Sequence, residues 1–245
     1  MDETERFQAD VERHVAAQRR DADIQALSRM WMRLTAASKY SHNFSWLGRP
    51  IIQFPQDMVA IQELIWRIKP AVVVETGIAH GGSLIFHASI LELLGGDREV
   101  VGVDIDIRPH NRAAVESHPL AGRIHMIQGS SIDPEIVERV RRRVAQRGPV
   151  LVLLDSNHTH DHVLAEIKAY SLLVTRGSYL VVFDTLVEDL PPDMFVDRPW
   201  GPMNSPKTAV REFMKTTTRF EVDHEMEAKL LITVAPEGYL RCIGE

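Results

Sequence analysis

Five short strand candidates, several of them continuously apolar, alternate with helix-like segments from Ala71 onward, and this alternation constrains the fold more than any other feature. The runs are expected to be strands at residues 71–75, 100–104, 123–128, 150–155 and 178–184. Runs that are apolar at every position are typical of strands covered on both faces. The intervening segments 83–94, 134–144 and 161–173 have helical patterning. The chain is therefore predicted to be an α/β protein with a doubly wound, mainly parallel sheet.

The segment before this core is predicted to be a separate unit. Residues 1–40 have a loose helical spacing, whereas Gly48 and Pro50 mark residues 41–56 as irregular. A further helix is expected over residues 57–68. We predict an N-terminal helical extension of residues 1–56, which contacts substrate or another subunit, and a main domain of residues 57–245.

The segment after the fifth strand begins with a proline-rich loop at residues 185–206, which cannot form a regular element. A loop of this length in a compact domain is usually functional. A helix is expected at residues 208–215. Strand-like runs at residues 220–222 and 229–234 are expected to pair as a C-terminal antiparallel hairpin.

Composition excludes several classes of protein. Of the 245 residues only Cys242 is a cysteine, so an internal disulfide and a zinc site with two or more cysteines are both excluded. A net charge of −6 argues against nucleic acid as a partner and favours a small-molecule or glycan substrate. The sequence contains no apolar run long enough for a membrane span and no signal-peptide pattern at its start, so a cytoplasmic location is expected. The amphipathic N-terminal helix makes a homo-oligomer the expected assembly.

Ligands of open parallel sheets bind beyond the carboxyl ends of the strands, and the first two strand ends suggest a cofactor site. The stretch ETGIAHGGS supplies Gly77 and Gly81 for a tight turn, but it is neither GxGxxG nor a phosphate loop. Glu75 would repel a pyrophosphate and suits a cationic or zwitterionic ligand. Asp104 is placed to accept hydrogen bonds from ribose hydroxyls. Together they favour an adenosine-type cofactor over a plain strand–helix turn.

The third strand ends in QGSSID, where two interpretations stay open. Ser130 or Ser131 could contact an adenine edge. Alternatively, Ser131 or Asp133 caps the helix that begins at Pro134.

The fourth and fifth strands end in Asp155 and Asp184, which should converge at the sheet edge. Two converging carboxylates repel unless a cation or a proton lies between them, and oxygen ligands favour Mg²⁺, Mn²⁺ or Ca²⁺. His158 follows closely and is suited to accept a proton near neutral pH. We expect His160 and His162 to be exposed residues at a helix start. A competing interpretation groups Asp155, His158 and His162 as an iron site with two histidines and one carboxylate.

Several stretches together carry a resemblance to a known family. They are SWLGRPIIQFPQDMVAIQELIWRIKP, VVVETGIAHGGSLIFHASIL, LLDSNHTHDHVLAEIKAY, YLVVFDT, GPMNSPKTAVREF and LLITVAPEGYL. From about Trp46 to Leu240 the chain resembles the cephalosporin hydroxylase-like family. That family includes S-adenosylmethionine-dependent O-methyltransferases that act on rhamnosyl and other sugar hydroxyls.

The resemblance implies the class I methyltransferase fold, a Rossmann-like, seven-stranded sheet whose last strand is antiparallel. It implies S-adenosyl-L-methionine and a divalent cation such as Mg²⁺ as cofactors. Asp155 and Asp184 match the metal-ligating acids, and His158 matches the general base. The residues that match the cofactor pocket are Glu75, Gly77, Gly81, Ser83 and Asp104, to which our own strand-end argument adds Ser131.

One position departs from the family pattern. Where much of the family has Glu-Asp after the fifth strand, this chain has Phe183 before Asp184. Water, Thr185, Glu188 or Asp189 would have to replace the missing ligand, or the metal binds weakly.

The predicted function is O-methylation of a sugar or a glycosylated natural product. Three aromatic residues could stack on a sugar face, or they could pack as ordinary aromatic side chains: Trp46, Phe195 and Trp200. A cephem or other secondary metabolite is the second choice of acceptor. Two other classes remain open, a nucleotide-dependent oxidoreductase and a non-catalytic S-adenosylmethionine-binding helper protein. Absence of GxGxxG counts against the oxidoreductase.

Overall fold

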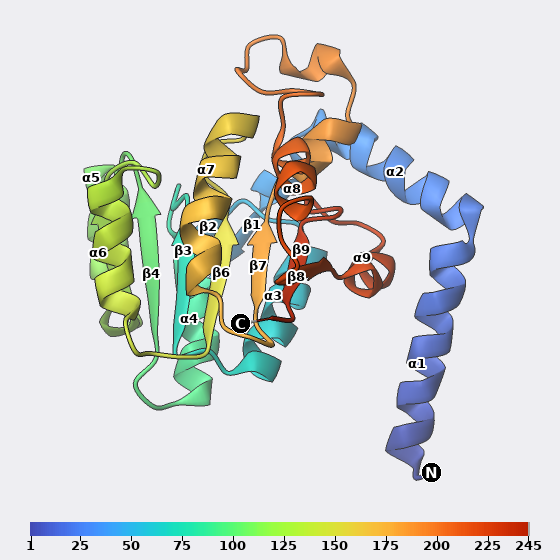
Figure 1. Cartoon of the computed structure of the whole chain (residues 1–245), viewed down its shortest axis with the longest axis horizontal. Coiled ribbons are helices and arrows are strands. Elements are labelled where there is room, and N and C mark those ends of the chain that lie inside the picture. Colours follow the sequence, from blue (N-terminus) through green and yellow to red (C-terminus); the bar gives the residue numbers. More distant parts are fainter. Residues whose placement is uncertain (245) are drawn as a thin grey trace.

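The computed structural model describes residues 1–244, in which seven strands form one sheet in the order β5-β4-β3-β6-β7-β9-β8 (Figure 1). Strands β3 to β7 are parallel to one another, and β9 is antiparallel to both β7 and β8. The strands are β3 (Val72–Thr76), β4 (Glu99–Asp104), β5 (Ile124–Gln128), β6 (Val150–Leu154), β7 (Tyr179–Val182), β8 (Phe220–Val222) and β9 (Tyr239–Cys242). The predicted doubly wound, mainly parallel sheet is confirmed.

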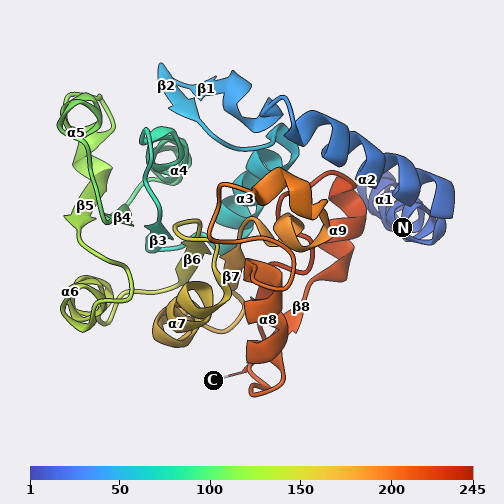
Figure 2. The ribbon, with the colours of Figure 1, turned by 90° about the horizontal axis from the view of Figure 1, so that it is seen from above.

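Helices cover both faces of this sheet (Figure 2). One layer consists of α3 (Pro55–Ile68), α4 (Gly82–Leu94) and α5 (Pro109–Glu116), and the other of α6 (Pro134–Val144), α7 (His160–Tyr170) and α8 (Pro206–Met214). Neighbouring strand residues face opposite layers: Val72 and Val74 pack in the α6–α8 core, and Val73 packs in the α3–α4 core. Both faces are covered, which explains the unbroken apolar sequences of β6 and β7.

The N-terminal segment is largely helical up to Ala36, in agreement with the helical pattern predicted over residues 1–40. It forms two helices, α1 (Glu3–Arg20) and α2 (Ala22–Ala36), because Asp21 accepts hydrogen bonds from the backbone N–H groups of Asp23 and Ile24 and so caps the second helix. In Figure 1 these helices extend away from the sheet. Every helix within residues 1–244 is too short or too polar to cross a membrane.

Residues 41–56, predicted to be irregular, contain the 3₁₀ turn η1 (Tyr40–Asn43) and an antiparallel hairpin of β1 (Phe44–Trp46) and β2 (Arg49–Ile51). Leu47 and Gly48 form its two-residue turn, and both have positive φ, as a type I′ turn requires. Gly48 is therefore the turn of a hairpin and not an interruption. The division into residues 1–56 and 57–245 stays a prediction.

The C-terminal hairpin is confirmed, but its second strand was predicted at the wrong place. Residues 229–234 do not form a strand, because Asp223 caps the helix α9 (His224–Leu230) and the following segment folds back onto Asp57. The partner of β8 is instead β9. The proline-rich loop at residues 185–206 also contains two short 3₁₀ helices, η4 (Thr185–Asp189) and η5 (Pro192–Phe195).

Candidate active site

A cavity of about 530 Å³ opens at the carboxyl ends of β3, β4, β6 and β7. It is closed from the other side by η1, the segment after β2, and the η4–η5 loop. Seven of the predicted site residues line it: Glu75, Gly77, Ser83, Asp104, Asp155, His158 and Asp184. A smaller cavity of about 170 Å³ adjoins it at Gly77, Asp104 and Ser156, and it contains the predicted Ser131.

The glycine turn after β3 is required by packing as well as by any ligand. Gly77 has a φ of +90°, and a Cβ there would lie 2.0 Å from the carbonyl oxygen of Asp155. Gly81, the N-cap of α4, has a φ of +80°, and its Cβ would lie 2.5 Å from Val115. Side chains at these positions would be strained and would also overlap with their neighbours. Gly81 therefore lies behind the cavity wall and contributes by packing.

Glu75 is only 3% exposed and has incomplete hydrogen bonding. Its Oε1 accepts a hydrogen bond from the Ser83 hydroxyl. Its Oε2 lies 3.2 Å from His87 Nε2, within ion-pair distance, but no donor in the described residues has hydrogen-bond geometry to it. A buried carboxylate oxygen without a donor is costly, and a ligand that carries N–H groups would satisfy it.

Asp104, at the tip of β4, fixes the same turn from the other side. Its Oδ2 accepts hydrogen bonds from the backbone N–H groups of Ile78 at 2.7 Å and Ala79 at 3.2 Å, and its Oδ1 accepts from Asp106. Each carboxylate oxygen can accept more than one hydrogen bond. The side chain is therefore held rigidly at the cavity wall and retains capacity for a hydroxyl donor.

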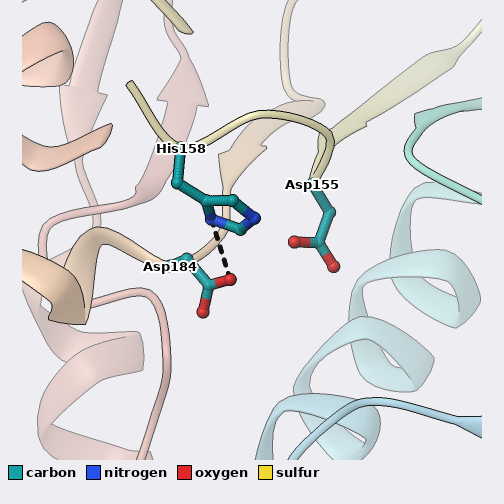
Figure 3. A group of neighbouring side chains, drawn as sticks. All are labelled: Asp155, His158 and Asp184. Atoms are coloured by element: carbon teal, nitrogen blue, oxygen red, sulfur yellow. Dashed lines mark ion pairs between the residues drawn. The ribbon is translucent and has the colours of Figure 1, made fainter. Parts of the chain in front are cut away.

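Asp155, His158 and Asp184 meet in front of the ends of β6 and β7 (Figure 3). One ligand atom from each lies within 4.8 Å of the others. Burial and the charges of Asp184 and Glu75 raise the pKa of Asp155 well above its ordinary value. These carboxylates repel each other, and a divalent cation between them would relieve that repulsion.

His158 is oriented by Asp184. Its Nδ1 lies 2.9 Å from Asp184 Oδ2, and because a carboxylate accepts, Nδ1 carries the proton and Nε2 is the nitrogen that faces outward from the pair. Burial lowers the pKa of His158. The charge and the hydrogen bond of Asp184 raise it by more than burial lowers it, so the net shift is upward. A histidine held in one tautomer by a carboxylate is suited to proton transfer.

Two of the three predicted aromatic residues lie at this cavity. Trp200 packs against the His158 ring with a centroid distance of 4.8 Å, and Phe195 is in the cavity wall. Trp46 is not in the wall, because it packs edge-on against Phe86 and donates its indole N–H to Ser89.

Phe183, the residue that departs from the family pattern, does not face the cavity. Phe183 is 4% exposed and lies in the core between the sheet and α3–α4. The three side chains considered as replacement ligands are engaged elsewhere. Thr185 donates to the Pro236 carbonyl, Glu188 accepts from Met203 and Ser205, and Asp189 pairs with Lys207.

Sequence reasoning missed Gln53. This residue, between β2 and α3, is 8% exposed and lines the cavity, and its Nε2 lies 3.4 Å from Asp155 Oδ2. The only sequence signal is a glutamine in an otherwise apolar stretch, PIIQFP, in a region predicted to be irregular.

The expectation that His160 and His162 are exposed was wrong, since both are half-buried. The Nδ1 of His160 contacts the Thr208 hydroxyl at 2.8 Å, outside the cavity wall. The Nε2 of His162 contacts Ser131 at 3.1 Å and faces the smaller cavity. His162 therefore does not join the Asp155–His158 group, and the proposed iron site is wrong.

The fold and the sequence both have known relatives. A model of the family Rhamnosyl O-methyltransferase/CmcI matches residues 38–243. The Rhamnosyl O-methyltransferase of Mycobacterium leprae is 32% identical over 80% of this chain and 82% of its own length. The same-named protein of Mycobacterium tuberculosis H37Rv is 32% identical over 75% of this chain and 72% of its own. Among solved structures, CmcI with Mg and SAM superposes with a TM-score of 0.59 at 20% identity, covering 83% of this chain and 78% of the other.

An O-methyltransferase of Bacillus cereus in complex with SAH has the same fold, with a TM-score of 0.51 at 15% identity over 82% of both chains. The seven-stranded sheet with its antiparallel β9 is therefore that of a class I methyltransferase. The chain belongs to the Rhamnosyl O-methyltransferase/CmcI family and is an S-adenosylmethionine-dependent O-methyltransferase.

Proposed function

We propose that this enzyme transfers the methyl group of S-adenosylmethionine to a hydroxyl of a sugar or a glycosylated natural product, with His158 as general base and a divalent cation at Asp155 and Asp184. The observation that carries the proposal is the His158–Asp184 pair beside Asp155, in a cavity also lined by Glu75 and Asp104. The named activity of the two mycobacterial relatives supports the choice of a sugar acceptor.

The cavity divides into two halves under this proposal. The cofactor half consists of Glu75, Gly77, Ser83 and Asp104, with Ser131 in the adjoining cavity. The Oε2 of Glu75, which has no hydrogen-bond donor among the described residues, suits the ammonium group of S-adenosylmethionine, and Asp104 suits its ribose hydroxyls. The acceptor half consists of η1, which belongs to the predicted N-terminal unit of residues 1–56, and the η4–η5 loop with Phe195 and Trp200.

A bound divalent cation would polarise the acceptor hydroxyl and lower its pKa. Asp155 and Asp184 would hold that cation. Gln53 lies close to Asp155 through its Nε2, and with its amide rotated it would offer a neutral oxygen in place of the carboxylate that Phe183 does not supply. His158 Nε2 takes the hydroxyl proton as the oxygen–carbon bond forms and the carbon–sulfur bond of the sulfonium breaks. Asp184 keeps the imidazole in the required tautomer.

Calorimetric titration with S-adenosylmethionine and with NAD, each with Mg²⁺ and with EDTA, tests the cofactor. Binding of S-adenosylmethionine alone is expected and would justify a screen of hydroxyl acceptors. That screen repeats the Mg²⁺ and EDTA comparison for methyl transfer, which is expected to fall when metal is removed. Folded protein that binds no S-adenosylmethionine would refute the proposal. Binding without transfer to any acceptor would favour the helper-protein alternative.

A further inference from the structure

Besides His158, four basic side chains line the cavity: Lys39, His42 and Arg198 from the segments of the acceptor half, and His80 from the glycine turn after β3. Within residues 1–244 none of them forms an ion pair with a carboxylate, and this holds in a protein with more acidic than basic residues. They come from three segments that are distant in sequence, namely the turn into η1, the glycine turn after β3, and the end of the η4–η5 loop. Their convergence is therefore a product of the tertiary fold.

The basic side chains lie around the reacting centre. Lys39, His42, His80 and Asp184 all line the same cavity. Partial burial and the charges of Lys39 and His80 lower the pKa of His42, while Asp184 acts on it in the opposite direction. The guanidinium of Arg198, which also lines the cavity, lies 5.3 Å from the centre of the Trp200 ring. Trp200 in turn packs against His158.

The acidic residues of the cavity do not neutralise the charge of the basic ones. Glu75 is bound by Ser83, and Asp104 is bound by backbone N–H groups. Asp155 and Asp184 belong to the proposed cation site. S-adenosylmethionine carries a sulfonium, an ammonium and one carboxylate, so its net charge is +1, and together with a divalent cation it offsets three of the four carboxylate charges. The cationic Lys39 and Arg198 then leave one positive charge unmatched at the cavity.

Building on the proposed function, we propose that Lys39, His42, His80 and Arg198 bind an anionic group on the acceptor, so that this enzyme methylates a sugar that carries a phosphate or a carboxylate. Lys39 acts here as a point charge, Arg198 can donate two parallel hydrogen bonds to such a group, and the imidazoles of His42 and His80 can each donate one hydrogen bond. The anion would lie on the side of Trp200 and η1, with the reacting hydroxyl directed toward His158.

Matched acceptor pairs test this inference by calorimetry on the protein loaded with S-adenosylhomocysteine and Mg²⁺. Rhamnose 1-phosphate is compared with methyl rhamnoside, and methyl glucuronide with methyl glucoside. In at least one pair the charged sugar is expected to bind about tenfold more tightly, with a preference that shrinks at high salt. The pair that shows it identifies phosphate or carboxylate. Equal or tighter binding of the neutral sugar in both pairs would overturn the inference. Failure of S-adenosylhomocysteine to bind would instead count against the proposed function.

Two variants connect the preference to these side chains. Lys39→Met and Arg198→Met lie on different segments, and each is expected to remove most of the preference for the charged sugar while leaving S-adenosylhomocysteine affinity unchanged. Arg176→Met, an exposed site beside the amino end of β7, is the matched control and should keep the preference. A preference that persists in both cavity variants would show that these side chains do not bind the anion.

Discussion

The cofactor half and the acceptor half of the cavity differ in burial, in charge and in how the chain builds them. Glu75 is 3% exposed and Asp104 is held by three backbone N–H groups, whereas Lys39, His42 and Arg198 are exposed. The cofactor half arises from two adjacent strand ends, and the acceptor half from segments more than a hundred residues apart. The comparison suggests that the first half is fixed by backbone packing and the second by a few side chains.

The largest expected effect lies where the two halves meet. His158→Ala should lower kcat by about 10²- to 10⁴-fold, because the acceptor proton loses its base. Affinity for S-adenosylmethionine should stay within about twofold in calorimetry, since His158 is not in the cofactor half. His160→Ala, a nearby histidine outside the cavity wall, is the control and should retain activity. Weakened cofactor binding in His158→Ala would show that His158 also contributes to the cofactor half.

The rigidity of the cofactor half is tested at Gly77. Gly77→Ala should lower the free energy of unfolding by about 2–6 kcal/mol, the combined cost of positive φ and of overlap with the Asp155 carbonyl. Gly177→Ala separates these two causes, because Gly177 also has positive φ but a Cβ there would meet nothing within 4 Å. Urea denaturation measures both. Similar losses in the two variants would mean that strand-end packing contributes little.

A buried carboxylate beneath the acceptor half gives a pH-dependent prediction. Asp57 accepts hydrogen bonds from Thr233, Val234 and Tyr239, and burial raises its pKa from 3.8 to about 6. Between those two pH values the folded protein keeps a proton that the unfolded chain releases, so the contribution of Asp57 to stability is greatest below pH 4 and is lost as pH rises through 6. The loss is about 3 kcal/mol.

Asp57→Asn cannot ionise and should not show this loss. The difference in unfolding free energy between the wild type and Asp57→Asn should therefore change by about 3 kcal/mol between pH 4 and pH 7, measured by urea denaturation. Parallel pH curves for the two proteins would contradict a raised pKa at Asp57.

The smallest effect is expected from the aromatic wall of the acceptor half. Trp200→Leu removes the contacts with His158 and Arg198, each worth about 0.5–1.5 kcal/mol. KM for the acceptor should rise severalfold, and S-adenosylmethionine affinity should not change. Trp46→Leu, outside the cavity, serves as the control in the same steady-state assay. A change in cofactor affinity in Trp200→Leu would show that the halves are coupled.

The same contrast explains which features were predictable from sequence. Strand ends in a parallel sheet share one edge, so the group of Asp155, His158 and Asp184 follows from local pattern alone. Gln53 and Arg198 reach the cavity through long-range packing, which leaves no periodic signal in the chain. The prediction of a strand at residues 229–234 was wrong for a long-range reason. The apolar side chains of this run pack in a small core and its backbone donates to Asp57, instead of pairing with another strand.

The position of β9 between β7 and β8 has a consequence for biosynthesis. Strand β8 is made before β9, yet it has no partner in the sheet until Tyr239–Cys242 has left the ribosome. Until then, β7 presents an apolar open edge that other nascent chains can pair with. A premature stop before Tyr239 would therefore yield aggregated protein, even though every residue of the proposed catalytic group is already present.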